Sequence, residues 1–364
     1  MKGNRNSEAY RQSHLRDDGE SPGRNESERI GGLESEKLRR SSLQPEGEGS
    51  HLWLWVEKRS ANTDWVAKEI ARAAVCPVRD VGYAGLKDRH AITRQWFSVP
   101  VTSTTQESLE NAEIEGVKVL ESQYHTRKLK RGTLDGNRFQ LRIRKFTGDD
   151  GETAGRLERI RETGVPNYFG PQRFGHNGQN VERGYLLLRK RARIPRNKRS
   201  IYISAIRSFL FNQVLAERVR RGDWNTIIEG DLAMLDGTHS IFPCENPDSD
   251  IEDRASRLDV HPTGPMPGES GTQPTGAAAD MEREVLNNWP QLTGVLETQR
   301  VQASRRSLRL YPAGLEWSFD NNDLVLAFAL PPGTYATTVL REVLVFSDAA
   351  RGQGFKQGDN KVGR

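Results

Sequence analysis

The spacing of apolar residues in the first third of the chain predicts strands that surround one helix. In residues 51–56, HLWLWV, leucine and valine alternate with two tryptophans, which is the period of a strand that is apolar on both faces. Asn62 or Thr63 can cap a helix whose apolar residues recur at helical spacing, and Pro77 closes it. Shorter strands are predicted around residues 81–84, 94–99, 117–120 and 138–145.

The middle of the chain changes to helical periodicity. A helix is predicted over residues 204–221, with an apolar stripe along one side and Gly222 in the position after its end. Residues 243–279 are rich in proline, glycine and acidic residues, and they predict a long loop. A second helix is predicted at about residues 280–288.

Strand-like patterns return near the C-terminus. Residues 324–330, LVLAFAL, predict a continuously buried strand, and a short helix is expected at about residues 337–346. Strand-rich ends thus enclose a helical middle, which predicts one α+β domain interrupted by an insertion. Residues 1–44 have too little apolar surface to offset the entropy of ordering, so they predict a disordered arm, and residues 347–364 predict a flexible tail.

Composition and charge exclude several classes of protein. Only 35% of the 364 residues are hydrophobic, and 54 Lys+Arg against 49 Asp+Glu leave a net charge of +5, so the distribution of charge matters more than its total. Two cysteines cannot build a disulfide framework or a cysteine-rich zinc site. The sequence contains no apolar run of membrane-helix length and no apolar signal core, which favours a cytoplasmic protein without membrane contact.

The segment with the strongest indication of chemistry is residues 82–97, GYAGLKDRHAITRQWF. A strand enters a turn at Gly85 and a second strand leaves by Gln95, which places Asp88 on a loop that a sheet holds rigidly. Functional residues are common on such loops. A loop aspartate is also a frequent turn former or solvated charge. From the pattern alone, both roles remain open for Asp88.

Other catalytic signatures are absent from the sequence. It contains no GxxxxGK[ST] phosphate loop, no HExxH motif and no GxSxG elbow. None of the seven histidines is paired with cysteine at metal-ligand spacing. The sequence therefore predicts no bound metal.

Residues 136–145, GNRFQLRIRK, predict a strand with one apolar and one cationic face. Basic side chains beside an aromatic ring suit a nucleic-acid surface, because cations neutralise phosphates and rings stack on bases. An edge strand with a solvated face has the same pattern, and both interpretations remain open. Residues 189–199 hold seven basic residues and no acid, and they are either part of such a surface or a solvated helix flank. The RNA-contact candidates are Arg127, Lys128, Lys130, Arg131, Arg142 and Arg144.

Four segments occur in order along the chain and together resemble the signature segments of the TruD family of tRNA pseudouridine synthases. They are residues 85–95 (GLKDRHAITRQ), 136–139 (GNRF), 167–175 (NYFGPQRFG) and 330–341 (LPPGTYATTVLR). Residues 45–51, PEGEGSH, are similar to the family's PxGEGEH motif. For residues 167–175, the pattern itself favours a structural role in which the aromatic rings pack a hinge between domains.

The resemblance implies an α+β fold, with a pseudouridine synthase catalytic domain built on a mixed, mostly antiparallel sheet. It implies that residues 45–163 and 310–346 form this domain, and that residues 164–309 form a family-specific α/β insertion, the TRUD domain. It also implies that the protein isomerises uridine 13 of tRNA to pseudouridine without a cofactor. The implied partner is tRNA, and the protein is expected to be a monomer with no obligate protein partner.

The resemblance also assigns site residues by their motif positions. It implies that Asp88 is the catalytic aspartate and that Asn137, Phe139 and Tyr335 line the uridine site. Tyr335 stands where many members have phenylalanine. One departure concerns the family's first strand, EDFxVxE, because ungapped alignment puts Ser35 at the position of its phenylalanine. This departure motivates an alternative function, that of a tRNA chaperone of the same fold with impaired turnover.

Overall fold

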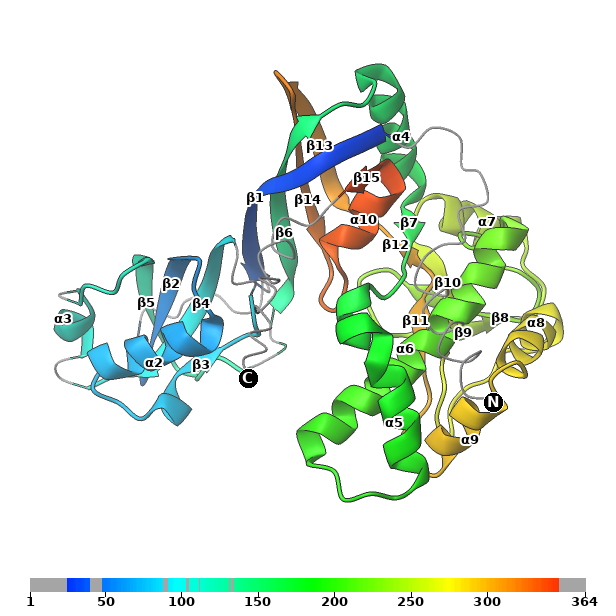
Figure 1. Ribbon diagram of the computed structural model, residues 1–364, viewed down its shortest axis with the longest axis horizontal. Helices are drawn as coiled ribbons and strands as arrows, with labels where there is room; N and C mark the ends of the chain where they lie inside the picture. Colours follow the sequence, from blue (N-terminus) through cyan, green and yellow to red (C-terminus); the bar gives the residue numbers. More distant parts are fainter. Residues whose placement is uncertain are drawn as a thin grey trace, which may run out of the picture. The chain divides into compact units, whose positions relative to one another are not determined.

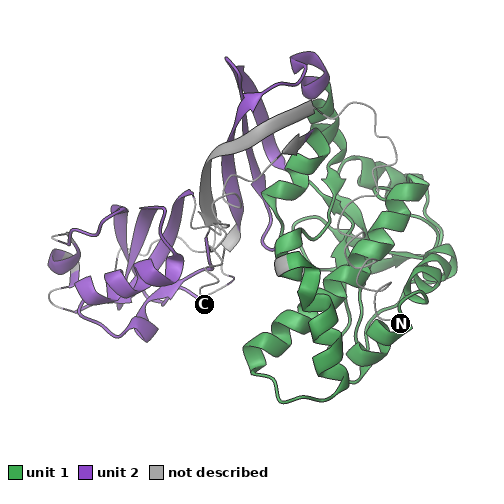
Figure 2. Cartoon of the chain, viewed as in Figure 1, with its two compact units in different colours: residues 1–24, 155–311, 334–343 green, residues 25–154, 312–333, 344–364 purple. Residues whose placement is uncertain are grey.

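The computed structural model divides the described chain into two compact units (Figures 1 and 2). The described residues are 25–39, 48–87, 91–102, 105–110, 112–130, 132 and 134–346. Asp88 and Arg131 lie outside them, as do the remaining parts of the predicted arm and tail. Unit 1 contains residues 155–311 and 334–343, and unit 2 contains the described residues from 25 to 154, 312 to 333 and 344 to 346.

Unit 2 is built on a nine-stranded sheet in the order β13-β14-β6-β1-β4-β2-β5, with β15 beside β1 and β3 beside β4. Strand β1 runs parallel to β4 and β15, and the other described pairs of this sheet are antiparallel. This confirms the predicted α+β class with a mixed, mostly antiparallel sheet. The strands are β1 (Asn25–Arg39), β2 (His51–Arg59), β3 (Gly82–Tyr83), β4 (Ile92–Pro100), β5 (Val117–His125), β6 (Leu134–Phe146), β13 (Ala313–Asp320), β14 (Asp323–Leu330) and β15 (Leu344–Phe346).

Strand β1 corrects the prediction that the chain is disordered as far as residue 44. Its backbone pairs with β6 on one side and β4 on the other, so that Ser35 lies between Phe139 and Thr93 in the sheet. The sequence prediction failed because sheet pairing uses backbone groups that every residue carries, and these find partners only when the neighbouring strands are in place. A strand therefore occupies the position at which the resemblance leads us to expect the family's first strand, with Ser35 where that pattern has phenylalanine.

Strand β6 has the two faces that its sequence predicts. Phe139, Leu141 and Ile143 are buried, whereas Arg138 and Arg144 are exposed. Strand β14 alternates between buried and half-buried residues, so the prediction that it is buried throughout is wrong. An antiparallel sheet can pack one face on a core and leave the other partly open to water, which explains the alternation.

Helix α2 (Thr63–Ala73) covers one face of the β2–β4 part of the sheet. Its Val66 and Ile70 are fully buried in one core cluster with Phe97 of β4. On the other face of β2, Trp53 is buried against a tryptophan of β4. Strand β2 is therefore apolar on both faces, as predicted. The other helices that begin in this unit are η1 (Val78–Asp80), α3 (Thr105–Glu110) and α4 (Asp150–Thr163).

Unit 1 packs helices around α6, together with a four-stranded sheet in the order β11-β10-β8-β9 and the short pair β7–β12 (Figure 1). Its helices, apart from the end of α4, are η2 (Pro171–Phe174), η3 (His176–Gly178), α5 (Gln179–Arg189), α6 (Arg196–Arg221), α7 (Ser249–Ser256), α8 (Gly276–Leu286), α9 (Pro290–Glu297) and α10 (Ala336–Val343). Its strands are β7 (Val165–Pro166), β8 (Asp231–Leu235), β9 (Ile241–Cys244), β10 (Val260–Met266), β11 (Ser304–Ser307) and β12 (Arg309–Leu310).

The prediction of a long loop over residues 243–279 is wrong. This segment holds the end of β9, all of α7 and β10, and the start of α8. Strand β10 has the sequence VHPTGPM, with low intrinsic strand propensity, yet all but its last residue are buried because it pairs with β8 and β11. Tertiary pairing outweighs local propensity in this strand.

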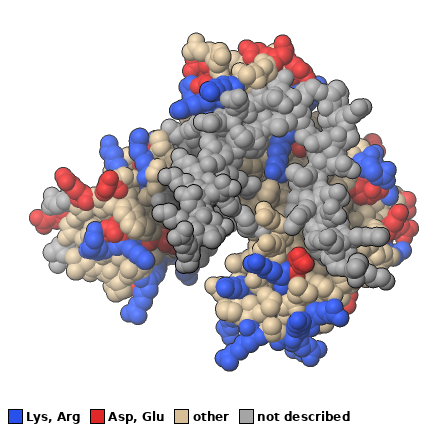
Figure 3. Space-filling view, viewed as in Figure 1, with Lys and Arg blue, Asp and Glu red and all other residues tan. Residues whose placement is uncertain are grey.

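Helix α6 begins at Arg196, earlier than predicted, and ends as predicted at Arg221, where Gly222 follows with a left-handed φ of 78°. Basic residues of the segment 189–199 are exposed in the described structure. Figure 3 shows lysine and arginine side chains gathered over the end of unit 1 that holds α5 and the start of α6. In the described part of the chain, no helix combines the length and apolar character needed to cross a membrane.

A buried ion pair fastens the end of α6 to β8. The side chains of Arg218 and Asp231 are fully buried, and Nη1 of Arg218 donates to the two carboxylate oxygens at 3.1 and 3.2 Å. Nη2 donates to the backbone oxygens of Asp223 and Thr226 at 2.9 and 2.6 Å. Loss of the arginine would leave a buried carboxylate without its charge partner.

We predict that Arg218→Met lowers the free energy of unfolding by about 3–5 kcal/mol, because breaking one side of a buried ion pair costs this much. Urea unfolding monitored by circular dichroism measures the change. The control is Arg283→Met, which removes an exposed pair with Asp280 and should cost less than about 1 kcal/mol. Similar small losses in the two variants would contradict the role of Arg218.

Candidate active site

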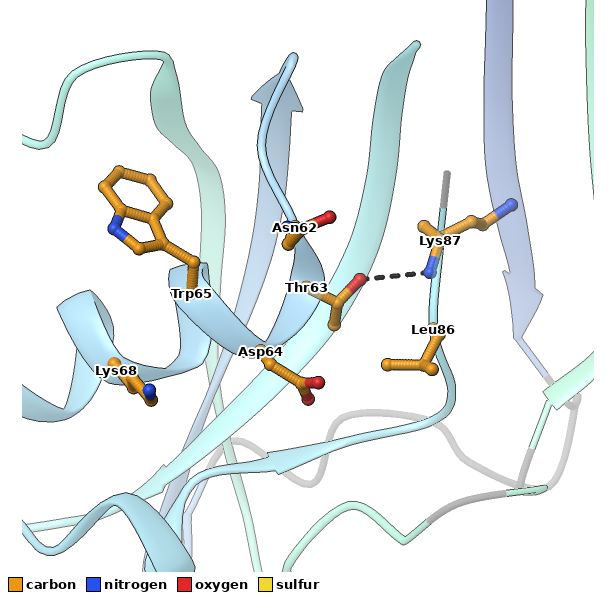
Figure 4. Close-up of a pocket in the computed structure, with 7 residues that line it drawn as sticks. All are labelled: Asn62, Thr63, Asp64, Trp65, Lys68, Leu86 and Lys87. Atoms are coloured by element: carbon orange, nitrogen blue, oxygen red, sulfur yellow. Dashed lines mark hydrogen bonds between the residues drawn. The ribbon is translucent and has the colours of Figure 1, made fainter. Parts of the chain in front are cut away.

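Two hydrogen bonds hold the segment that precedes Asp88, residues 84–87. The N–H of Gly132 donates to the carbonyl oxygen of Ala84 at 3.0 Å, just after β3. The N–H of Lys87 donates to Oγ1 of Thr63, in the first turn of α2, at 3.0 Å (Figure 4). Asp88 is the next residue, so the chain reaches its position from a segment fastened to α2.

Strand β3 lies unusually close to its neighbours. A Cβ at Gly82 would stand 2.4 Å from both the carbonyl oxygen of Leu129 and Oγ of Ser98. Glycine is therefore required here, since any side chain would displace the strand. This close packing positions the strand that leads to Asp88.

The structure brings Phe139 and the residue before Asp88 together. Nζ of Lys87 lies 5.5 Å from the centre of the Phe139 ring, a cation–π distance. The ring is tilted against Phe328 of β14 at 5.8 Å, and Phe139 is only 9% exposed. Asn137 is half-buried and lies two residues earlier on β6, on the same face of the strand. Two of the predicted uridine-site residues thus share the face of β6 on which Lys87 contacts Phe139.

Tyr335 belongs to unit 1, where it packs against the core that contains Phe169. The guanidinium of Arg306 lies 4.1 Å from the centre of the Phe169 ring, and that of Arg173 lies 5.1 Å from it. Burial lowers the pKa of Arg306 to about 10, Tyr335 opposes this change, and the charge of Arg173 adds to it. Phe169 and Phe174 of the same motif are buried in the core of unit 1. The aromatic rings that were expected to pack a hinge between domains therefore pack this core.

The predicted RNA-contact residues differ in their surroundings. Arg127, Lys130 and Arg144 are exposed. Nζ of Lys128 donates to the carbonyl oxygen of Arg79 at 2.6 Å. Arg142 forms ion pairs of 2.9 and 3.0 Å with two aspartates, Asp320 and Asp323, which hold its charge and raise its pKa.

The first turn of α2, for which no functional role was predicted, forms a pocket with the segment before Asp88. Trp65 and Lys68 come from the helix, and Leu86 and Lys87 come from the segment after β3 (Figure 4). The sequence does contain one indication of this pocket, a tryptophan among charged residues on the outer side of an amphipathic helix. Among the described residues, no three His, Cys, Asp or Glu side chains cluster as metal ligands do.

Comparison with a solved structure first defines the fold. The chain matches the crystal structure of a protein from Methanosarcina mazei that was assigned as a tRNA pseudouridine synthase D, with a TM-score of 0.66. The match covers 89% of this chain and 94% of the other, at 21% sequence identity. The chain therefore shares the fold of that protein.

Sequence comparisons then identify the family. The family model described as tRNA pseudouridine synthase D (TruD) matches residues 33–193 and 188–343. The tRNA pseudouridine synthase D of Methylococcus capsulatus is 46% identical over 84% of this chain and 86% of its own length. That of Nitrosococcus oceani is 44% identical over 85% and 87%. The chain belongs to the TruD family, and it is an isomerase that forms pseudouridine in tRNA.

We predict that Thr63→Val loosens the approach to Asp88, because valine keeps the shape of threonine but cannot accept the Lys87 N–H. Losing one such acceptor costs about 1–3 kcal/mol, which should speed exchange of the Lys87 amide hydrogen about 5- to 150-fold. Hydrogen exchange followed by NMR measures this rate. The control is Thr298→Val, which removes a hydroxyl from unit 1 and should leave the exchange rate of the Lys87 amide unchanged. Equal exchange rates in the wild type and in Thr63→Val would show that the hydrogen bond to Thr63 does not hold this segment.

Proposed function

We propose that the protein isomerises uridine 13 of tRNA, with Asp88 as the catalytic group and without a cofactor or metal. Pseudouridine formation in tRNA follows from the family, whereas the position and the aspartate are the proposal. The observation that supports it best is the contact between Lys87 and the Phe139 ring. This contact brings the neighbour of Asp88 to a residue that matches the family's uridine site.

One carboxylate is sufficient for the reaction. The N1–C1′ bond breaks, the base turns, and a C1′–C5 bond forms, while C5 loses a proton and N1 gains one without net redox change. Asp88 either attacks C1′ or takes the C2′ proton to form a glycal. An aspartate carboxyl has a reference pKa of ~3.9 and is ionised at neutral pH, as both routes require.

The target uridine must leave its stack in the folded tRNA, which costs ~a few kcal/mol. Stacking of the base on Phe139 offsets part of this cost, since one base on one ring contributes ~1–3 kcal/mol. Asn137 supplies an amide donor and acceptor for the uracil edge. We also propose that Tyr335 contacts the uridine, on the basis of its motif position alone.

The tRNA backbone requires cations that are open to solvent. Arg127, Lys130 and Arg144 meet this condition, and we propose them as phosphate contacts. Lys128 is proposed with them. Arg131 is proposed as a phosphate contact from the sequence alone. Arg142 is the weakest candidate, because it already forms ion pairs with two aspartates.

The chaperone alternative is less favoured. Its motive was the missing phenylalanine of the family's first strand, at whose position Ser35 stands; the backbone of β1 nevertheless occupies the sheet, with Ser35 opposite Phe139. The relatives that match most of the chain are named as synthases. We propose that the enzyme acts on tRNA as a monomer in the cytoplasm.

We predict that Asp88→Asn keeps its affinity for tRNA and loses turnover, because the amide has the shape of the carboxylate but is neither basic nor nucleophilic. The assay uses an unmodified tRNA transcript, detects pseudouridine by mass spectrometry after derivatisation, and maps its position. Wild-type enzyme should modify nucleotide 13, and a transcript with cytidine at that position should gain no pseudouridine. Residual activity above a few per cent in the variant would remove Asp88 from its role, and modification elsewhere would reassign the target.

We predict that Phe139→Ala lowers single-turnover rate more than tRNA affinity, because phosphate contacts dominate affinity and stacking serves the flipped base. The expected loss of rate is about 5- to 150-fold, the equivalent of ~1–3 kcal/mol. Phe319→Ala is the control, since the Phe319 ring lies tilted against Phe146 at 5.8 Å elsewhere in the same sheet. Equal losses of rate and affinity would indicate a folding defect instead of a missing stacking partner.

A further inference from the structure

A basic groove runs along α2 beside the approach to Asp88. It consists of two open hollows of about 320 and 620 Å³, which share Asp64 and Lys68 among their lining residues. The first hollow reaches Leu86 and Lys87, next to the proposed catalytic residue. The second extends to Lys128 and other residues before β6. Both hollows lie within unit 2, and their two shared lining residues join them into one groove.

The charge of the groove is strongly one-sided. Its described lining contains five cations and one carboxylate, Asp64, which accepts a hydrogen bond from the hydroxyl of Tyr83 at 2.6 Å. The positive charge also acts on His51, whose pKa is lowered by burial and then by Lys128. A polyanion is therefore the occupant that the groove favours. The cations are Lys68, Arg79, Lys87, Lys128 and Lys130.

Apolar surface lies open in the hollow that Leu86 and Lys87 line. Trp65 is 41% exposed and Leu86 is 64% exposed. Helix α2 packs on the sheet through Val66 and Ile70, which are fully buried, so packing of the helix does not require an indole at position 65. An open ring among cations provides what single-stranded nucleic acid binds, a stacking platform beside phosphate partners.

The groove is also connected to the catalytic loop. The hydrogen bond from the Lys87 N–H to Oγ1 of Thr63 joins the first turn of α2, which carries Trp65, to the segment before Asp88. A base stacked on Trp65 is therefore held by the same turn that anchors the loop. This places the groove where nucleotides next to the target uridine would pass.

We propose that this groove binds an unpaired stretch of the tRNA next to the target uridine, with one base stacked on Trp65 and backbone phosphates on Lys68, Arg79, Lys128 and Lys130. The inference rests on the proposed catalytic position of Asp88 for its location and on tRNA as the substrate for its ligand. An acidic protein segment is the competing occupant, but it provides no row of planar bases for the exposed indole.

The first test compares tRNA affinity of Trp65 variants by filter binding. Trp65→Ala should raise the Kd for an unmodified transcript about 5- to 150-fold, the loss expected for one stacked base. Trp65→Phe, which keeps a ring, should recover most of the affinity. The control is Leu120→Ala, because Leu120 is also 41% exposed but lies on β5 outside the groove. Filter binding measures affinity and needs no turnover, so this result does not depend on whether Asp88 is the catalytic residue.

The second test measures how affinity depends on salt. Each phosphate neutralised contributes about 0.7–0.9 to the slope of log affinity against log salt. The double variant Lys68→Gln, Arg79→Gln should make that slope shallower by roughly 1.5. Lys118→Gln, an exposed lysine on β5, is the control and should leave the slope unchanged.

Affinity and slope equal to wild type in the Trp65 and double variants would overturn the proposal and favour a protein occupant. If a variant unfolds, hydroxyl-radical footprinting of the wild-type protein decides instead. Saturating tRNA should protect Trp65 from oxidation at least several-fold and leave Leu120 unprotected. Equal oxidation of Trp65 with and without tRNA would likewise overturn the proposal.

Discussion

The register of β6 between β14 and β1 is the constraint on which the arrangement of unit 2 depends. It places Phe139 opposite Phe328 on one side and Ser35 on the other. Because side chains alternate between the faces of a strand, a slip of one residue would bring Arg138 to the face that Phe139 now occupies. The contact of Phe139 with Lys87, and with it the relation between β6 and the segment that precedes Asp88, requires this register.

Part of the positive charge of the chain serves the fold and is therefore unavailable to RNA. Arg218 is buried against Asp231, and Arg305 is buried against Glu282. Arg309 is buried as well and donates to the ring of His261 and to backbone oxygens. A net charge of +5 thus says little about the binding surface. Exposed cations that share a groove can create a strong local field despite a small total.

The predictions succeeded where local pattern and tertiary environment agree. The alternation in β2 and β6 and the apolar stripe of α6 depend on faces that a sheet or core then covers. They failed for β1 and β10, whose sequences have few of the residues that favour strands. Both strands lie between two partners, and pairing on both edges supplies the stabilisation that their own propensity lacks.

The sequence by itself determined the family, the motif residues Asp88, Asn137, Phe139 and Tyr335, and the two-faced character of β6, because residue types and their spacing carry this information. Only the tertiary structure decided that Lys87 reaches the ring of Phe139, that Arg142 is held by aspartates, and that Trp65 stands open beside the loop. These contacts join segments far apart in the chain. Their geometry follows from strand register and helix packing, which no local pattern specifies.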